Sequence, residues 1–440
     1  MRRVCHALCM RVQSTNSKMK ILNIIAGVLI AGVAVNSFAS HGESKPGERN
    51  SSGTVSAGCS DINQLPKLAC APAPSSVFSD SGRLWVAWSY AGHVYVSYSD
   101  DKAKTFSLPV SVNSVPEKIS ARGENRPKIA LNNKGAIYVS WTTPLKKRFS
   151  GNVRFSYSND NAKSFSQPVT VNDNLDITGH RFEALTVADN GNIYLAWLDK
   201  RDRFKAEKAA KKYHGAALYY SWSDNGGKSF HSNQKIIDHS CECCRVAIDT
   251  DNKNLPVILW RNIYDKNTRD HTLVNFNAPG FPAEPVRVSF DNWQVDACPH
   301  HGPDLSISRK TNDYHLVWFD NAVKRHGLFY MRMNNKNKQS TPLKFGNYKA
   351  AASHPSVLSK GNKVWLSWKE FDGKKASLWS QFSTDNGDSW SKEKPLAETT
   401  AGSDYAFLLM DTNRVYIQWK TTQEGFQLIA LDESGTKVGQ

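Results

Sequence analysis

The feature that most constrains the fold is a tryptophan that recurs at the end of a short strand-like segment. Apolar and polar residues alternate before it, in segments such as Leu84–Trp88 and Ile137–Trp141. The seven tryptophans are Trp88, Trp141, Trp197, Trp260, Trp318, Trp368 and Trp419, and they follow one another at intervals of 50 to 63 residues. Such alternation is typical of half-buried strands, and a period of about 50 residues is typical of a closed array of sheets.

Around each tryptophan strand the sequence repeats the same order of elements. In the second unit a first strand is expected at Arg126–Leu131, a third at Val153–Tyr157 and a fourth at Pro168–Val171. The pattern predicts an all-β fold, a β-propeller with four-stranded blades, with seven blades favoured and six as the alternative. No segment shows helical periodicity. The last unit shows three strands, and residues 60–67 are expected to supply the fourth and close the ring.

A second repeated motif lies in the turn between the third and fourth strands of four units. It begins with Ser, has Asp or Asn two residues later, and ends on an aromatic residue. The copies are Ser99–Phe106, Ser158–Phe165, Ser223–Phe230 and Ser383–Trp390. The motif resembles the Asp-box, or bacterial neuraminidase repeat, of the sialidase superfamily. In that repeat the acidic side chain caps turn amides and the aromatic ring packs between strands. The resemblance implies a propeller fold, and it bears on the fold rather than on activity.

The first residues of the chain have the pattern of an export signal. An apolar run at Ile21–Val35 follows a basic segment, and Ser37-Phe38-Ala39 fits a cleavage site. We therefore expect a signal peptide at residues 1–39, of which 1–18 could be an upstream overhang. A flexible lead-in at 40–57 and a single propeller domain at 58–440 are expected to follow. The processed protein is expected to be periplasmic or secreted, with no membrane span.

The chain is basic, with a formal net charge of +16, of which five charges fall in the expected signal peptide. This charge favours acidic partners or anionic surfaces. The lysine-rich run at Lys205–Lys212 is interpreted as a solvated loop rather than a nucleic-acid patch. The insertion around it, Lys200–Tyr213, could dock an acidic protein.

Cysteine and histidine gather at one kind of position, the start of the first strand of a unit. In a propeller the first strands line the central channel, so their starts meet at one mouth. The gathered residues are Cys241, Cys243, Cys244, Cys298, His300, His301 and His354. Thiolate and imidazole are ligands of zinc and copper, and thiolate-rich sets favour Cu(I). The arrangement predicts a site for a copper or zinc ion at the mouth.

Disulfides are the alternative, because export exposes thiols to an oxidising compartment. Cys59 could pair with Cys70, and the four cysteines of the cluster could give two further bridges. Neighbouring thiols in one strand are poorly placed to bridge each other, however. In a regular strand Cys243 and Cys244 would also point to opposite sides. Redox-active thiols are a third possibility.

The resemblance to sialidases also implies an enzyme hypothesis. Members of the family hold a sugar carboxylate with three arginines, and use a Tyr nucleophile paired with Glu and an Asp acid/base. The candidate substrate-binding residues here are Arg126, Arg181, Arg245, Asp404 and Tyr405. The sequence departs from the family pattern because Cys70-Ala71-Pro72 stands where Arg-Ile-Pro is expected, and no Tyr matches the nucleophile motif. The sequence therefore assigns no catalytic residue, and leaves three hypotheses: a metal-binding propeller, an exo-sialidase or other glycosidase, and a non-catalytic binding protein stapled by disulfides. In each, the expected ligand at the mouth is a metal ion or a small acidic molecule.

Overall fold

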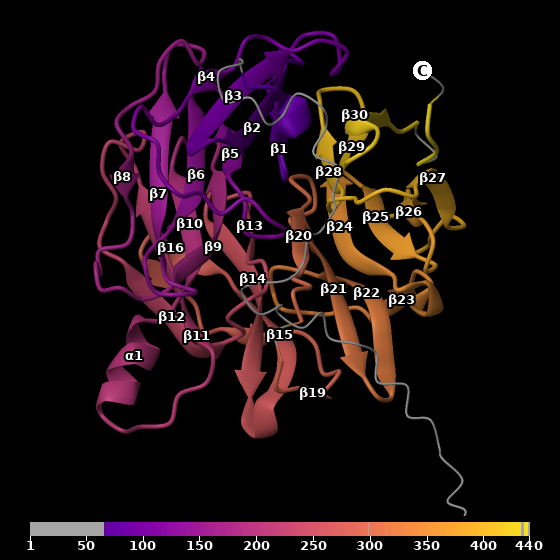
Figure 1. The fold of residues 1–440 in the computed structure, drawn as a ribbon. Coiled ribbons are helices and arrows are strands. Elements are labelled where there is room, and N and C mark those ends of the chain that lie inside the picture. The colour runs from indigo at the N-terminus through magenta and orange to yellow at the C-terminus, as the bar shows by residue number, and fades with distance from the viewer. Residues whose placement is uncertain (1–65, 298, 433–434, 439–440) are drawn as a thin grey trace, which may run out of the picture. The chain divides into compact units, whose positions relative to one another are not determined.

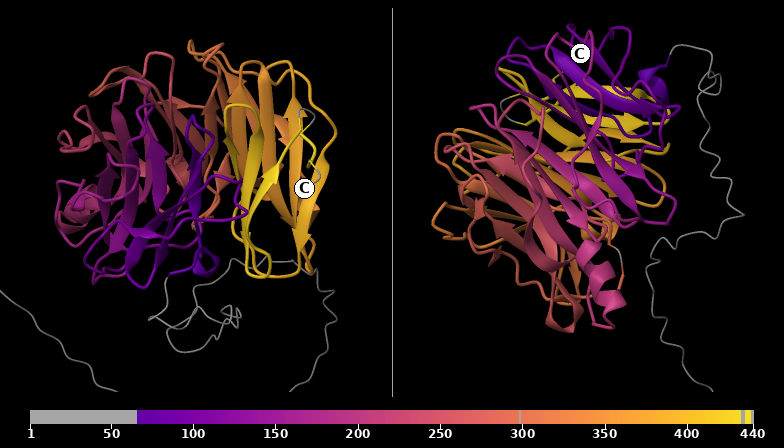
Figure 2. Two further views of the ribbon diagram at one scale, coloured as in Figure 1. Left: turned by 90° about the horizontal axis from the view of Figure 1, so that it is seen from above. Right: turned by 90° about the vertical axis from the view of Figure 1, so that its left-hand side faces the viewer.

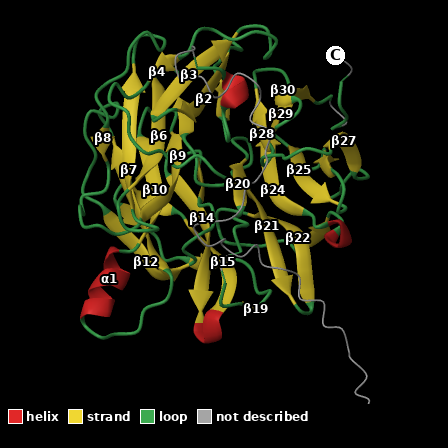
Figure 3. Ribbon diagram, in the orientation of Figure 1, coloured by secondary structure: helices red, strands yellow, loops and turns green. Residues whose placement is uncertain are grey.

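The computed structural model describes residues 66–297, 299–432 and 435–438. This part of the chain is built of β-strands, with one α-helix, α1 (Arg201–Lys208), and three short 3-10 helices (Figures 1 and 3). The short helices are η1 (Leu68–Cys70), η2 (Asp265–Asn267) and η3 (Tyr348–Ala350). The expected signal peptide, the lead-in and most of residues 60–67 lie outside the described residues. None of the described helices is long and apolar enough to cross a membrane.

The strands form antiparallel sheets that follow one another along the chain. The first sheet is β1 (Ser75–Phe78), β2 (Leu84–Tyr90), β3 (His93–Ser99) and β4 (Val110–Ser111). The second is β5 (Lys128–Leu131), β6 (Ile137–Pro144), β7 (Gly151–Ser158) and β8 (Val169–Thr170). In both, the strand order in space equals the order in sequence.

A nine-stranded sheet comes next and contains two runs of this kind. The first run is β9 (His180–Val187), β10 (Ile193–Asp199), β11 (Ala216–Ser223) and β12 (Gln234–Ser240). The second is β13 (Ala247–Thr250), β14 (Pro256–Tyr264) and β15 (Thr268–Val274), with β18 (Val286–Arg287) and β19 (Trp293–Gln294) on β15. The runs join through one residue pair, Ser240 of β12 with Asn262 of β14. A small hairpin of β16 (Phe276–Ala278) and β17 (Phe281–Pro282) lies between β15 and β18 in sequence.

The remaining strands form three sheets in the same pattern. One is β20 (Asp304–Ile307), β21 (Tyr314–Ala322), β22 (Arg325–Met333) and β23 (Leu343–Phe345). The next is β24 (Ser353–Lys360), β25 (Lys363–Phe371), β26 (Ala376–Ser383) and β27 (Lys394–Thr399). The last has three described strands, β28 (Phe407–Met410), β29 (Val415–Thr421) and β30 (Gly425–Ala430).

The sheets are arranged as the blades of a β-propeller. Their first strands contact one another in chain order, from β1 through β5, β9, β13, β20 and β24 to β28, and β28 contacts β1. The indigo first sheet accordingly lies beside the yellow last sheet in Figures 1 and 2. Each pair of neighbouring sheets shares an apolar cluster. The cluster that joins the last sheet to the first contains Phe78, Leu84, Trp88, Leu409 and Tyr416.

The recurring tryptophans are buried in these clusters, which explains their spacing in the sequence. All seven are at most 1 % exposed. A buried indole N–H needs an acceptor, and most of these tryptophans find a nearby carboxylate or amide oxygen. Trp197 Nε1 donates to Asp199 at 2.9 Å, and Trp368 Nε1 donates to Glu370 at 2.9 Å. The repeat therefore records one packing position in every sheet, with a polar partner for the indole in most of them.

The four repeated turns make the same hydrogen bonds. In the first copy, Asp101 Oδ1 accepts from the Thr105 amide at 2.9 Å, and Ser99 Oγ accepts from the Ala103 amide at 2.8 Å. In the third copy Asn225 Oδ1 takes the place of the carboxylate and accepts from the Ser229 amide at 3.1 Å. The closing aromatic ring reaches the preceding sheet, as in the edge-on contact of Phe230 with Phe155 at 4.9 Å. These hydrogen bonds stabilise the turns between the third and fourth strands of the sheets.

One local prediction was wrong: part of the lysine-rich run is helical. Helix α1 spans Arg201–Lys208, and its residues have high helix propensity. Asp199 Oδ1 accepts from the Arg201 amide at 2.9 Å at its start, and Arg203 pairs with Glu207 at 2.9 Å along it. These contacts favour a helix although its two turns bury only Arg201. Because almost no side chain is buried, no apolar periodicity was visible.

Candidate functional site: a buried thiol cluster

Three thiols meet in the turn between β12 and β13. Cys241 Sγ lies 3.9 Å from Cys243 Sγ and 3.5 Å from Cys244 Sγ. All three residues carry thiols rather than disulfides. The expectation that Cys243 and Cys244 would diverge assumed a regular strand and was wrong, because residues 242–244 form a turn. The Cys241 amide donates to the Arg261 carbonyl at 2.9 Å, which holds this turn against β14.

The thiols are buried in apolar surroundings with two arginines directed at them. Cys241, Cys243 and Cys244 are 1 to 5 % exposed and pack in the cluster that contains Trp260. Arg269 Nη1 donates to Cys241 Sγ at 3.1 Å, and Arg261 Nη1 donates to Cys244 Sγ at 3.5 Å. Hydrogen bonds from the other two thiols, together with both arginines, hold the pKa of Cys241 well below its usual value. The cluster therefore favours a thiolate at Cys241.

The segment 299–303, which contains the predicted ligands His300 and His301, packs on this turn through Gly302. Glu124 joins the two stretches: its carboxylate accepts from the Arg245 amide and from the Gly302 amide, both at 2.8 Å. A Cβ at Gly302 would lie 2.4 Å from the Arg245 Cβ, so any side chain there would push the stretches apart. Cys298, one of the predicted ligands, lies outside the described residues.

The predicted histidine ligands form a pair of their own. The rings of His301 and His354 lie 4.4 Å apart, and His354 stacks on Tyr405 at 3.4 Å. His354 Nε2 donates to the His300 carbonyl at 3.1 Å, so its Nδ1 carries a lone pair. In the described structure the Nδ1 atoms of His301 and His354 are buried and make no hydrogen bond. Burial lowers the pKa of His301 to about 3, and that of His354 also lies well below its usual value.

The imidazoles do not join the thiols in the described structure. Cys241, Cys243 and Cys244 have donor atoms within 4.8 Å of one another, and no described histidine belongs to that group. The sequence predicted one Cys/His site, whereas the fold separates a thiol cluster from an imidazole pair. Both remain neutral or anionic donor sets suited to a soft or borderline metal ion.

Two of the three predicted substrate arginines bind other protein groups. Arg126 is 1 % exposed and forms a two-pronged ion pair with Asp404, with Nη2 at 2.7 Å from Oδ1. Arg245 Nε donates to the Pro303 carbonyl at 2.8 Å, and its Nη2 donates to the Pro355 carbonyl at 3.1 Å. Tyr405 lies against both His354 and Arg126. Both guanidinium groups hold the strand starts together.

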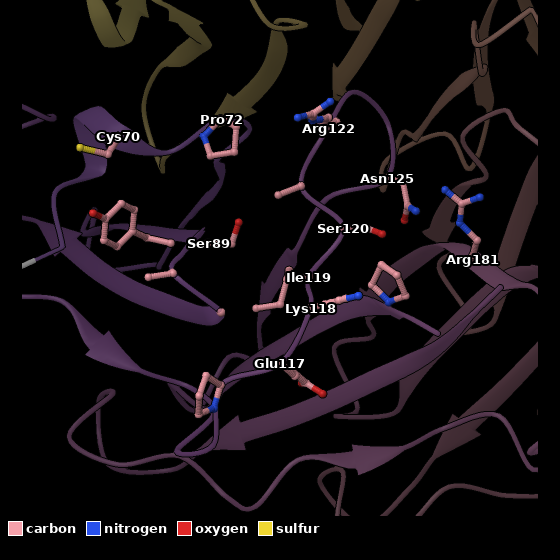
Figure 4. A pocket seen from close by; sticks show the side chains of 16 residues that line it. Cys70, Pro72, Ser89, Glu117, Lys118, Ile119, Ser120, Arg122, Asn125 and Arg181 are labelled. Carbon is pink, nitrogen blue, oxygen red and sulfur yellow. The ribbon is translucent and has the colours of Figure 1, made fainter. Parts of the chain in front are cut away.

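The third arginine, Arg181 at the start of β9, lines an open pocket of about 950 Å³ instead. Cys70 and Pro72 line the same pocket (Figure 4). Cys70 is disulfide-bonded, and the other described cysteines carry thiols and are not its partner. Cys59, the predicted partner, lies outside the described residues.

A second group of potential metal ligands consists of buried carboxylates. Donor oxygens of Asp270, Asp291 and Asp320 lie within 4.8 Å of one another. Arg287 pairs with Asp270 and Arg325 pairs with Asp291, while burial raises the pKa of Asp320 to about 8. Two arginines and one proton thus balance the three acids, which makes this a charge-compensated structural cluster.

The residues that the sequence analysis missed are Glu124, Arg261 and Arg269. Arg261 directly follows the tryptophan of its strand, but Lys369 and Lys420 follow theirs in the same way. Its position was therefore no distinctive signal. Glu124 and Arg269 stand out only once the turns are folded against each other.

No protein-family model and no curated protein matches the sequence. Among solved structures, a PL25 ulvan lyase bound to -[GlcA(1-4)Rha3S]- aligns with a TM-score of 0.52 and 13 % identity over 83 % of this chain and 96 % of that chain. A further structure described as PL25 ulvan lyase gives 0.53 and 13 % over 85 % and 94 %. A Hadza microbial sialidase gives 0.44 and 14 % over 74 % and 71 %. At these identities the likeness to the ulvan lyases is one of fold alone.

Proposed function

We propose that this protein is an exported sialidase-like β-propeller that binds a soft transition metal ion, Cu(I), through Cys241, Cys243 and Cys244. The observation that carries the proposal is the convergence of three buried sulfurs beside two arginines. Cysteines that serve only to form disulfide bonds would be placed in pairs with facing Cβ atoms. Here all three sulfurs lie within 4.8 Å of one another instead.

The spacing of the sulfurs suits one shared ion. Metal–sulfur bonds of about 2.3 Å place three sulfurs about 3.8 to 4.0 Å apart around a common centre. Cys241 Sγ lies 3.9 and 3.5 Å from the other two sulfurs, far longer than a disulfide bond. A small outward movement of Cys244 would complete the arrangement.

The charge of the surroundings favours a monovalent ion. Three thiolates and Cu(I) carry a net charge of −2, which Arg261 and Arg269 balance at 3.5 and 3.1 Å. Three thiolates and Zn(II) carry −1, which would leave a buried positive charge uncompensated. The imidazole pair of His301 and His354 could hold a second ion or accept one from the thiols.

Burial favours holding or passing on the ion over catalysis at it. A catalytic metal keeps a coordination position open to substrate, whereas these thiols are at most 5 % exposed. The glycosidase alternative has less support, because Arg126 and Arg245 donate to protein groups rather than to an open site. We also infer seven blades of the Asp-box type, because the first strands of seven consecutive runs contact one another in a ring.

The test is anaerobic titration of the reduced, processed protein with Cu(I) against a competing chelator, with thiols counted on the same sample. We expect one Cu(I) per chain at the thiols. Cys241→Ser should weaken binding at least about 100-fold, because even indirect contacts to a metal ligand contribute 10- to 100-fold. The matched control is Glu242→Gln, since the Glu242 side chain pairs with Lys200 and Arg203 at 2.8 and 2.9 Å. Failure of the reduced protein, with its thiols counted as free, to bind Cu(I) would overturn the proposal.

A further inference from the structure

The open pocket of about 950 Å³ has a lining of its own, which includes Cys70 and Pro72. Its lining comes from the β2–β3 turn, from the segment between β4 and β5, and from Pro144 and Arg181. Figure 4 shows Asn125 between Arg122 and Arg181 on one side of the pocket. None of the thiol-cluster residues lines it.

The pocket carries more positive charge than its own acid can balance. Lys118, Arg122 and Arg181 line it, and Lys118 and Arg122 are exposed. Neither of those two has an ion-pair partner among residues 66–297, 299–432 and 435–438. Glu117 is the one carboxylate in the described lining, and it is engaged by Trp141 Nε1 at 2.8 Å and by Arg154 Nε at 3.6 Å. The pocket is therefore electrostatically suited to an anion.

Neutral polar groups line the same pocket. Asn125 is 5 % exposed, and its Oδ1 accepts from the Phe182 amide at 3.4 Å. Its Nδ2 is buried without a hydrogen-bond partner within the described chain. A buried amide donor of this kind is costly unless a ligand or solvent oxygen accepts from it. Ser89 and Ser120 add hydroxyl groups to the lining.

An exposed aromatic ring stands beside this lining and is surrounded by cations. Phe149, in the loop between β6 and β7, is 45 % exposed. The guanidinium of Arg148 lies 4.5 Å from its ring centre, that of Arg181 5.7 Å, and the Lys200 ammonium 5.8 Å. Phe149 also has a φ of 60°, a left-handed conformation that is unfavourable for a bulky residue. The loop thus holds an apolar ring exposed next to the pocket in spite of its backbone strain.

We propose that this pocket and the Phe149 loop bind an anionic polysaccharide, a chain of uronate or sulfated sugars. A sugar ring presents an apolar C–H face that can lie on Phe149, and its carboxylate or sulfate can pair with Arg122, Lys118 or Arg181. Its hydroxyl groups suit Asn125 and the serines. An acidic peptide needs the cations, but it has no ring hydroxyls and no need of the aromatic platform. The proposal uses none of the three thiols and does not rest on copper binding.

The test compares binding of four polymers to the processed protein by calorimetry at about 0.15 M salt. They are polygalacturonate for carboxylates, dextran sulfate for sulfates, neutral dextran, and polyglutamate. We expect saturable binding of one or both anionic polysaccharides and none of neutral dextran. Whichever of the two binds identifies the anionic group.

Three variants decide the origin of that binding. Lys118→Gln with Arg122→Gln should lower the affinity about tenfold, as expected for loss of charge-assisted hydrogen bonds. Phe149→Ala should lower it severalfold for the polysaccharide and leave polyglutamate unaffected. Lys310→Gln with Lys363→Gln, in a separate basic pocket, is the matched control and should change nothing.

Equal effects of the pocket and control variants would overturn the proposal in favour of diffuse charge. Polyglutamate binding as tight as that of either polysaccharide, unaffected by Phe149→Ala, would overturn it in favour of an acidic protein. Absence of saturable binding to any polymer would remove the site altogether.

Discussion

The thiol cluster and the Arg126–Asp404 pair occupy the same kind of position, at or beside the start of first strands, yet they differ in what they leave to a ligand. Arg126 uses its donors on Asp404 and on the carbonyls of Gly123 and Pro74. Cys241 and Cys244 accept one arginine N–H each and otherwise face sulfur. The ion pair is complete within the protein, whereas the three sulfurs lie within 4.8 Å of one another and could share a ligand.

The difference shows why charge at a channel mouth is a poor guide to function by itself. The resemblance to sialidases directed attention to three arginines, and two of them are structural. The residue that joins the thiol turn to the loop at Gly302 is an acid, Glu124. Stability experiments can therefore distinguish, among the residues at the starts of the first strands, those that stabilise the fold from those that are available to a ligand.

The largest expected effect is on the ion pair. Arg126→Leu should leave Asp404 buried without its partner and lower the free energy of unfolding by about 3–5 kcal/mol, measured by urea denaturation. Arg83→Leu is the control, because the Arg83–Asp100 pair has side chains that are 30 % and 58 % exposed, and should contribute less than about 1 kcal/mol. A loss below that of the control would return Arg126 to the candidates for ligand binding.

The imidazole pair should make the protein sensitive to acid. Burial lowers the pKa of His301 from 6.5 to about 3. Between these values the unfolded chain binds a proton that the folded chain does not, so stability falls as the pH drops from 6.5 towards 3. At about pH 5 the loss at this site should reach about 2 kcal/mol.

Urea midpoints at about pH 7.5 and about pH 5 test this. His301→Gln should reduce the difference between the two midpoints, and His231→Gln, at an exposed histidine, should leave it as it is. An unchanged difference in the His301 variant would mean that the imidazole is protonated in the folded protein. The pair would then lose its affinity for a metal ion at about pH 5, because protonated imidazole has no free lone pair.

A substitution of Arg269 is expected to have an intermediate effect, which is on the pKa of a thiol in the cluster. The Arg269 Nη1 lies 3.1 Å from Cys241 Sγ, so Arg269→Gln should raise the pKa of the Cys241 thiol. The ultraviolet absorbance of thiolate against pH measures this, with Arg203→Gln as a control on the neighbouring helix. An unchanged thiol pKa would show that Arg269 does not stabilise the thiolate, which would weaken the charge argument for Cu(I).

The smallest effect is expected in the repeated turns, of which Ser99–Phe106 is the first. Asp101→Asn should leave the thermal midpoint almost unchanged, because Asn225 already makes the equivalent bond to the Ser229 amide in the third copy. Asp101→Ala removes the acceptor of the Thr105 amide and should lower the thermal midpoint by more than Asp101→Asn does. Thermal unfolding of both variants measures the difference, and a large loss on Asp101→Asn would show that the charge itself is required.

The sequence predicted the sheets well because their signals are local. Alternation and the tryptophan period depend on residues a few positions apart, and each tryptophan is buried where the period places it. Helix α1 was missed because it buries only Arg201, so it has no apolar stripe.

The site was predicted less completely, for a different physical reason. Side chains alternate between two faces in a regular strand, which predicted that Cys243 and Cys244 point apart. That alternation does not hold in a turn, and this turn depends on contacts with β14 and Glu124. Arg261 and Arg269 come from other strands, and nothing local in the sequence connects them to a cysteine. Whether a metal ion is bound stays a prediction.

The contact between the first and last sheets has a consequence for how the chain is made. Gln418 Nε2 donates to the Pro74 carbonyl, 344 positions earlier, at 2.6 Å, and Ser76 donates to Gln418 across 342 positions. A chain that emerges from its N-terminus has no partner for the apolar face of its first sheet until nearly all of it has been synthesised. During this time the exposed apolar face can associate with other chains, because loop closure over such a length is slow. A helper protein that covers β1 and β2 until β28 and β29 arrive would relieve that risk.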